Sequence, residues 1–417
     1  MKLSLFGRLT MALLASMALG LGMTACGGGT IGYMWVLGQQ YNQIAGFKID
    51  DYTGNLTTIP SSPFSSGGSV PVSIVVKAGG RYIYVVNQGT GGSQAGNGSG
   101  AGVAEYAVGG DGTLTYQATF FTQGFVSQWA QMDSSGTYLY VLDKYHEGPL
   151  NSQNLPTANT DGLGGITVFT ADPNTGRLSL VTNSQTQVGG INTNFWKVGQ
   201  IPFMMKTAGS CLFTVNSFDQ SVTPYSIGSG GQLITVQTSN PGAGSQPLGT
   251  NVATSINGSG SYVYVTDSGN NSIYPFTIGS GCTLTLVTGG AVPNVTSTVD
   301  PTYSLLDNSG KYLYVLNQNN TNTVTPLPNS SISAFTVNQS TGQLSPIQGS
   351  PFTVGSGPVC MVEDTSNQYI YVSNYNDGTV TGKVIDPTTG NLSVLTRGST
   401  FNATGHAGCL VLSGAVS

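Results

Sequence analysis

Short segments with alternating apolar positions recur along this chain at intervals of 49 to 73 residues. β-branched and aromatic residues on alternate positions are typical of half-buried strands. Most copies begin with Tyr and end with Asn or Asp. The seven segments are Tyr33–Leu37, Tyr82–Asn87, Tyr138–Asp143, Cys211–Asn216, Tyr262–Asp267, Tyr312–Asn317 and Tyr369–Asn374.

Three further strand signals accompany these segments. An apolar stretch, often opened by Pro as in Pro71–Val76, comes before the Tyr strand, and a second strand follows it. A tight turn such as Asp172–Gly176 then leads to a strand that opens with Leu. The Asp side chain caps such a turn, and Gly supplies its positive φ. Four strands in each repeat, here called A to D, predict the blade of a β-propeller.

The two ends of the chain predict how the ring closes. The first Tyr strand lacks its own leading strand, whereas Gly408–Leu412 has that character and no Tyr strand after it. Pairing the two would remove the open sheet edges of a linear array. We therefore expect an all-β fold over residues 31–417: a seven-bladed β-propeller with four antiparallel strands per blade, closed by the C-terminal strand.

Composition agrees with this fold and excludes several partners. Charged residues make up 7% of the 417 residues, the net charge is −5, and glycine occurs 60 times. Coiled coils need many charged surface positions, and nucleic-acid binding needs a basic footprint. We expect neither, and we expect a monomer. Zinc-spaced cysteines and nucleotide-binding motifs are missing from the sequence, so we expect no metal and no cofactor.

The first 25 residues predict export rather than structure. Lys2 and Arg8 precede an apolar run, Leu9–Leu21, which is too short to span a membrane. Small residues then lead to Cys26, an order that resembles a bacterial lipoprotein signal. That resemblance implies a lipidated Cys26, a tether over 26–30 and a membrane-anchored protein of the cell envelope, periplasmic or outer-surface. The alternative is ordinary secretory cleavage near this point.

Propeller connectivity separates the loops onto two faces. The A–B and C–D turns are short and share one side, which we call the short-turn face. The B–C and D–A connections vary in length and share the opposite side, the long-loop face. The longest B–C segments are Gln88–Gly102, Lys144–Gly165 and Gln318–Ser331. Variable loops above a rigid scaffold commonly carry function, so we expect the site at the channel mouth on the long-loop face.

A few side chains on this face could carry chemistry. His406, at the entry to the last strand, and His146 with the adjacent Glu147 are the candidate catalytic bases. The alternative is that both histidines are structural. Trp129 and Trp196 could stack on a sugar or simply pack between blades, and Asn374 could bind a ligand or cap a turn. The ligand-binding candidates are Lys144, Tyr145, Trp129, Trp196, Lys197, Asn374 and Tyr375.

The repeated Pro-led segment, the Ser-Gly-x-Tyr-x-Tyr-Val-x-Asn strand and the Thr-Gly-x-Leu turn resemble the seven-bladed lactonase-like propellers and the YVTN-repeat surface propellers. That resemblance implies activity on anionic or phosphorylated lactones, which arginine would bind best. The mature chain has three arginines, Arg81, Arg177 and Arg397, and none maps to the expected mouth. We therefore expect a propeller that binds a glycan, a peptide or an envelope protein, with lactone hydrolysis as the alternative.

Four cysteines remain after Cys26, and export exposes them to oxidising conditions. Cys360 lies on the innermost strand of blade 7, and Cys409 lies on the closing strand beside it. Cys211 and Cys282 belong to adjacent blades at the short-turn face. This placement favours the disulfides Cys360–Cys409 and Cys211–Cys282, with buried free thiols as the alternative.

Overall fold

The computed structural model describes residues 29–92, 98–150, 156–158, 161–188, 191–236, 246–247, 253–318 and 330–414. Cys26 and the expected signal segment lie outside these residues, as do parts of the three longest B–C segments. Within the described residues, none of the helices has the length and apolar character needed to cross a membrane.

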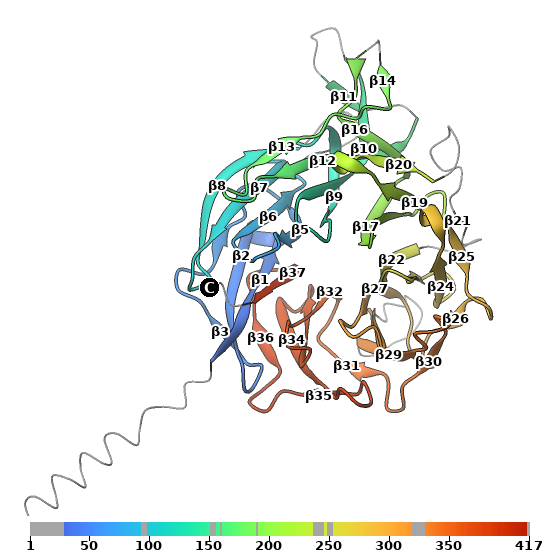
Figure 1. Ribbon diagram of the computed structural model, residues 1–417. Helices are drawn as coiled ribbons and strands as arrows, with labels where there is room; N and C mark the ends of the chain where they lie inside the picture. Colours follow the sequence, from blue (N-terminus) through green and yellow to red (C-terminus); the bar gives the residue numbers. More distant parts are fainter. Residues whose placement is uncertain are drawn as a thin grey trace, which may run out of the picture.

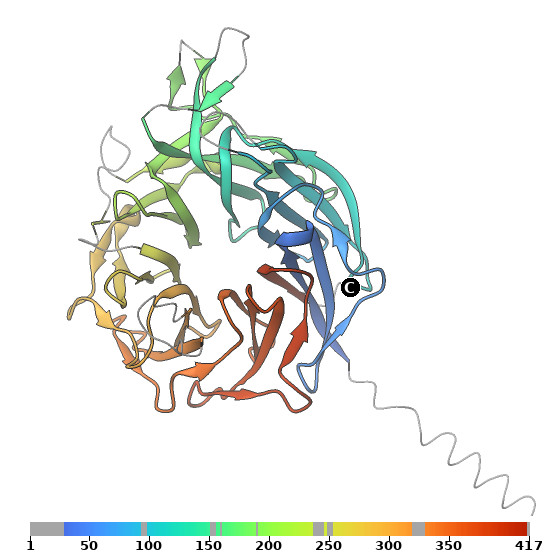
Figure 2. The ribbon, with the colours of Figure 1, turned by 180° about the vertical axis from the view of Figure 1, so that it is seen from behind.

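Seven sheets surround a central channel and confirm the all-β, seven-bladed propeller (Figure 1; Figure 2 shows the reverse side). Blade 1 contains β37 (Ala407–Gly414), β1 (Thr30–Gly38), β2 (Gln43–Asp50), β3 (Leu56–Thr58) and β4 (Phe64–Ser65). Blade 2 contains β5 (Pro71–Val76), β6 (Tyr82–Asn87), β7 (Gly102–Val108) and β8 (Leu114–Phe120). Blade 3 contains β9 (Gly124–Met132), β10 (Tyr138–Leu150), β12 (Leu163–Ala171), β13 (Leu178–Leu180), β11 (Pro156–Ala158) and β16 (Phe195–Gln200).

The remaining blades repeat the order from the channel outward. Blade 4 contains β17 (Pro202–Ala208), β18 (Cys211–Asn216), β19 (Ser221–Ile227), β20 (Leu233–Thr235) and β21 (Gln246–Pro247). Blade 5 contains β22 (Ala253–Gly258), β23 (Tyr262–Asp267), β24 (Ser272–Ile278), β25 (Leu284–Leu286) and β26 (Val292–Pro293). Blade 6 contains β27 (Pro301–Leu306), β28 (Tyr312–Asn317), β29 (Ser331–Val337), β30 (Leu344–Pro346) and β31 (Phe352–Thr353). Blade 7 contains β32 (Pro358–Glu363), β33 (Tyr369–Asn374), β34 (Thr379–Ile385), β35 (Leu392–Val394) and β36 (Thr400–Asn402).

Short elements complete the fold. A two-stranded ribbon joins β14 (Gln187–Val188) to β15 (Ile191–Asn192), and β14 is drawn outside the ring in Figure 1. Single 3-10 turns are η1 (Gln39–Tyr41), η2 (Ser229–Gly231) and η3 (Ser280–Cys282).

The chain closes its ring as the sequence predicts. Strand β37 pairs antiparallel with β1, and Trp35 lies opposite Val411 in the register. The C-terminal strand is therefore the innermost strand of the first blade, and it covers the edge of β1 that would otherwise be unpaired.

Tyrosines at the start of strand B join most blades to the next blade. Tyr33 donates a hydrogen bond to the Gly110 carbonyl over 2.7 Å, and Tyr371 reaches across the closure to the Gly54 carbonyl over 2.6 Å. The ring of Tyr312 packs so closely on Gly390 that a Cβ there would lie 2.4 Å from the ring. Gly390 also has a φ of +74°, so both sterics and conformation require glycine at this turn.

A disulfide takes the place of this contact between blades 4 and 5. Cys211 occupies the position of the first strand-B Tyr, and Cys282 occupies the turn position that is Gly342 in the next blade, with a φ of +69°. The Cys211–Cys282 bond joins Cα atoms 5.6 Å apart, and the second bond, Cys360–Cys409, joins Cα atoms 5.1 Å apart. Both pairings favoured by the blade map are thus present in the structure.

Blade 3 differs from the expected layout. The segment Lys144–Gly165 is not a plain loop, because β10 continues to Leu150 and pairs there with β11. The segment Phe195–Gln200 is likewise a strand, β16, which pairs with the outer edge of β12. Backbone pairing therefore orders part of a connection that was expected to be irregular.

Candidate functional site

Two aromatic rings meet inside the channel. Trp129 on β9 and Tyr303 on β27 occupy equivalent register positions, because they pair with Leu142 and Leu316 on their respective B strands. Blades 3 and 6 face each other across the ring, and the two ring centroids are 6.3 Å apart with planes inclined at 44°. This is an ordinary aromatic contact distance, so the pair bridges the channel at this level. Burial raises the pKa of Tyr303 to about 12.

A cavity of about 460 Å³ adjoins this aromatic pair. Its walls come from the second half of the A strands and from A–B turn residues such as Lys77–Gly80. The cavity therefore opens toward the short-turn face, whereas the sequence placed the site at the long-loop face. Its volume lies in the range of small-molecule sites, which commonly combine apolar walls with a few polar groups.

Two ionisable side chains in this cavity are perturbed by burial. The ammonium group of Lys206 makes no hydrogen bond or ion pair with another described residue, and burial lowers its pKa. Burial raises the pKa of Glu363 to about 7, partly opposed by the Asn308 N–H and reinforced by Asp307 and Asp364. The Asn308 N–H donates to Glu363 Oε2 over 2.6 Å. Perturbed groups in one concave site are typical of functional positions.

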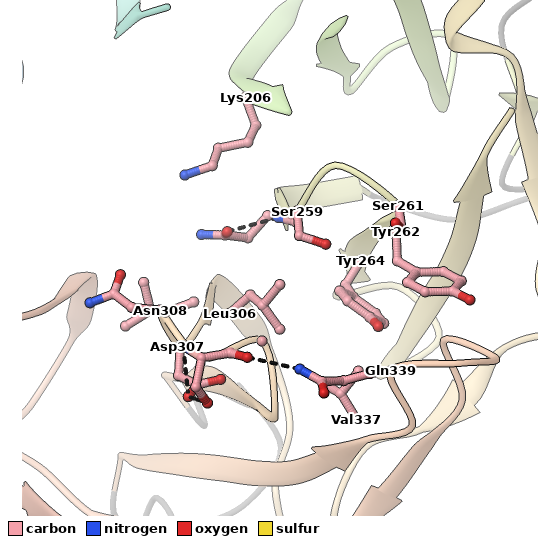
Figure 3. Close-up of a pocket in the computed structure, with 15 residues that line it drawn as sticks. Lys206, Ser259, Ser261, Tyr262, Tyr264, Leu306, Asp307, Asn308, Val337 and Gln339 are labelled. Atoms are coloured by element: carbon pink, nitrogen blue, oxygen red, sulfur yellow. Dashed lines mark hydrogen bonds between the residues drawn. The ribbon is translucent and has the colours of Figure 1, made fainter. Parts of the chain in front are cut away.

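A second depression, of about 470 Å³, lies between blades 5 and 6 and shares Lys206, Asn257, Leu305 and Asn308 with the channel cavity. Figure 3 shows Lys206 extended into the open space, with no labelled side chain against its ammonium group. Asp307 is occupied in capping its own turn, because its Oδ1 accepts the Tyr312 N–H over 2.7 Å. Lys206 is therefore the cation common to both depressions.

The structure places His406 beside Tyr375 at the junction of blades 7 and 1. The two rings stack with centroids 4.5 Å apart, and His406 Nδ1 lies 3.1 Å from the Tyr375 carbonyl oxygen. The Tyr375 hydroxyl donates to Gln39 Oε1 over 2.6 Å. Within the described part of the chain, no carboxylate lies within hydrogen-bond distance of His406.

The structure brings His146 together with Asp161 and Lys197 rather than with the Glu147 carboxylate. His146 Nε2 lies 3.0 Å from Asp161 Oδ2, and Lys197 donates to the same oxygen over 3.0 Å. Its Nδ1 lies 2.6 Å from the backbone oxygen of Glu147, and its ring stacks on Phe195. His146 is 4% exposed, so it is not a surface loop residue.

The neighbours of Asp161 in this cluster change the pKa of its carboxyl group. Burial alone would raise the pKa of Asp161, but hydrogen bonds from Lys197, His146 and the Leu163 N–H outweigh it and lower that pKa. Burial raises the pKa of Glu147. Both His146 nitrogens thus lie within hydrogen-bond distance of protein oxygens, so neither is directed at an open cavity.

The other predicted ligand-binding residues are dispersed. The ammonium group of Lys144 lies 5.5 Å from the ring centroid of Tyr145. Trp196 is buried in the core of blades 3 and 4, and only Trp129 of the two tryptophans lines the cavity. Asn374 is fully buried and donates to Thr379 and Thr381 over 3.0 and 2.9 Å, so it stabilises the B–C turn.

Sequence reasoning missed Lys206, Glu363 and Asp161. Lys206 is the one charged residue of the A strand Pro202–Ala208, and Glu363 is the last residue of the A strand Pro358–Glu363. A charged residue in the innermost strand of a blade is unusual, and this feature of the sequence could have identified both Lys206 and Glu363. Asp161 is 15 residues from His146, and only the fold of β10 and β12 brings them together.

The comparisons with known proteins agree with this architecture. The family model described as "Lactonase, 7-bladed beta-propeller" matches residues 194–326 and 289–408, and the chain belongs to that family. A search of curated proteins gives no match.

Solved structures share the fold at low identity. A Bacteroides fragilis protein named as a candidate 6-phosphogluconolactonase is 16% identical, with a TM-score of 0.66 over 92% of this chain and 98% of that one. The periplasmic gluconolactonase of Pseudomonas aeruginosa is 15% identical, with a TM-score of 0.64 over 92% of this chain and 99% of that one. At such identities the likeness extends to the fold alone.

Proposed function

We propose that this chain is an exported, lipid-anchored propeller that binds a small organic ligand in its central channel. The observation that carries the proposal is the cavity of about 460 Å³ beside the Trp129–Tyr303 pair. One side of the cavity is apolar, and on the other side the ammonium group of Lys206 has no partner among the described residues. This combination favours recognition of a compound with both apolar and polar parts.

Export and anchoring rest on the N-terminal sequence. The charged start, the short apolar run and Cys26 support lipidation of that cysteine. A lipid at Cys26 would attach the protein to a membrane without a transmembrane helix. The two disulfides are consistent with an oxidising compartment, where such bonds persist.

Lactone hydrolysis is the weaker alternative. A general base needs a lone pair directed at substrate and is commonly oriented by a second group. Both His146 nitrogens already contact protein oxygens, and the known contacts of His406 are with Tyr375. The relatives that suggest lactonase chemistry share only the fold with this chain.

A screen of the purified mature chain tests the proposal. Carboxylates, amides, amines, sugars and lactones are tested for binding by thermal shift and calorimetry, and the lactones also for hydrolysis. Val411→Trp fills the channel cavity, and Val394→Trp makes the same change at an exposed position on the outer strand β35. We expect ligands whose binding is lost in Val411→Trp and kept in Val394→Trp. Ligands that bind both variants equally, or turnover of a lactone that depends on His406, would contradict the proposal.

The long-loop face favours a second role in docking a glycan of the cell envelope. Tyr41, Phe121, Phe203 and Phe218 are exposed and lie on B–C and D–A connections or at the start of an A strand. Aromatic side chains on a charge-poor surface suit stacking against sugar rings. Sedimentation with insoluble peptidoglycan tests this role. Phe203→Ser/Phe218→Ser should reduce co-sedimentation, whereas Tyr52→Ser, on the opposite face, should not; equal retention of both would exclude it.

A further inference from the structure

The middle level of the channel is divided into a polar and an aliphatic side. In each blade, one residue of strand A pairs with the third residue of strand B. That third residue is Tyr84 in blade 2 and Phe213 in blade 4. In blades 3, 4 and 5 the strand-A residue of this pair is Gln131, Lys206 or Asn257. All three line the cavity.

The remaining blades complete the ring with aliphatic side chains. The equivalent residues of blades 6, 7, 1 and 2 are Leu305, Val362, Val411 and Val75, and they also line the cavity. A ring built from seven equivalent positions is thus polar over three consecutive blades and aliphatic over the other four. The cation stands at the centre of the polar arc.

We infer that the channel cavity binds a small monocarboxylate, with its carboxylate on Lys206 and its apolar body against the aliphatic arc. This inference rests on the proposed function and specifies its ligand class. Gln131 and Asn257 use their side-chain amides in contacts with Met132 and Ser304. Lys206 is therefore the group of the arc that lacks a described partner, and an anion would supply one.

The chemistry of lysine supports one point of attachment. An ammonium group is a compact charge with three N–H donors, so it can bind a single carboxylate, whereas the planar fork of arginine is suited to bidentate recognition. Arginine is not among the cavity residues. Among the described residues of the lining, Glu363 is the one carboxylate; it accepts the Asn308 N–H and does not form an ion pair with Lys206 within 4.0 Å. The ligand carboxylate would therefore not have to displace a protein one.

Calorimetry with octanoate and octanamide tests the inference, because the two probes share shape and differ in charge. The wild-type mature chain should bind octanoate at least about tenfold more tightly than octanamide, as expected for a charged hydrogen bond. Lys206→Gln should abolish this preference, because the charge that distinguishes the carboxylate from the amide is removed. Lys206→Met should behave in the same way. Lys311→Gln is the matched control, because Lys311 is an exposed lysine on the short-turn face, toward which the cavity opens.

The outcomes separate the ligand class from the function. Equal affinity of wild type for both probes, a preference that survives in Lys206→Gln, or absence of octanoate binding would overturn the inference. The proposal of ligand binding in the channel would still hold if other compounds of the screen bind the wild type and not Val411→Trp. That proposal would be contradicted if none of the compounds shows this behaviour.

Discussion

Trp129 and Tyr303, 174 residues apart in the sequence, meet inside the channel with ring centroids 6.3 Å apart. The contact follows from the repeat, because equivalent positions on opposite blades lie at the same depth. Other blades place smaller residues there, such as Ser73 and Ser255. The channel of this propeller is thus bridged by one aromatic pair, and the cavity beside it opens toward the short turns.

The Cys211–Cys282 disulfide should be replaceable by the contact that other blades use. Cys211→Tyr/Cys282→Gly introduces the Tyr and Gly that are found at the other junctions. Glycine adopts the positive φ of position 282 more readily than cysteine does. We expect the melting temperature of this variant, measured without reductant, to stay close to that of the wild type, because the Cys360–Cys409 bond is present in both. Cys211→Ser/Cys282→Ser should lose about 3 kcal/mol of stability. A Tyr/Gly variant no more stable than the Ser/Ser variant would contradict the equivalence.

Removal of the closing strand should open the ring. A chain truncated before Gly405 lacks β37, so β1 loses its inner partner and Cys360 loses Cys409. We expect aggregation and a lower melting temperature, because an exposed strand edge pairs readily with other chains. Cys360→Ser/Cys409→Ser is the control that removes the bond alone and should stay monomeric. An unchanged melting temperature after truncation would refute the closure.

Asp143 should make stability depend on pH. It is completely buried at the end of strand B, and burial raises its pKa to about 7 despite hydrogen bonds from Ser127 and Thr167. The folded state therefore holds the proton over a pH range in which the unfolded state has lost it. Its contribution is present below about pH 4 and is lost as pH rises through about 7, with a slope of up to about 1.4 kcal/mol per pH unit.

Asp143→Asn tests this effect, because Asn occupies the equivalent position in blade 2 as Asn87 and in blade 4 as Asn216. Denaturant unfolding should show a variant that gains stability relative to wild type between pH 5 and pH 8. Asp111→Asn is the control, since hydrogen bonds from Thr113 lower the pKa of that exposed carboxyl. A constant difference between wild type and Asp143→Asn across this range would disprove the assignment.

Cys26 should determine membrane attachment. Cys26→Ser expressed in the native host should appear in the soluble envelope fraction, because the thiol that would carry the lipid is gone. Fractionation followed by immunoblotting measures the distribution. Cys360→Ser/Cys409→Ser, which also lacks cysteines but keeps Cys26, should stay with the membrane. Equal membrane retention of Cys26→Ser would show that another feature holds the protein there.

The fold could be predicted from the sequence repeat, but the position of the cavity could not. Tyr strands, Leu-led outer strands and turns with Gly each report a local requirement, so the sequence identifies the blades and the closing strand. The cavity depends on which A-strand residues share a depth, and this follows only from the register. The polar side of the channel around Lys206 can be recognised only when the register shows that Gln131 and Asn257 occupy the equivalent positions in the neighbouring blades. His146 drew attention as a loop residue beside Glu147, yet strand extension buries it against Asp161.

The most direct test of channel binding is the fluorescence of Trp129, the one tryptophan of three that lines the cavity. Titration of the mature chain with octanoate should change the emission in a saturable way, with the midpoint that calorimetry gives. Trp129→Phe should lose this change while calorimetry still detects binding, and Trp196→Phe should keep it. Octanoate binding that leaves the emission of Trp129 unaltered, or a signal that persists in Trp129→Phe, would place the ligand outside the channel and contradict the account.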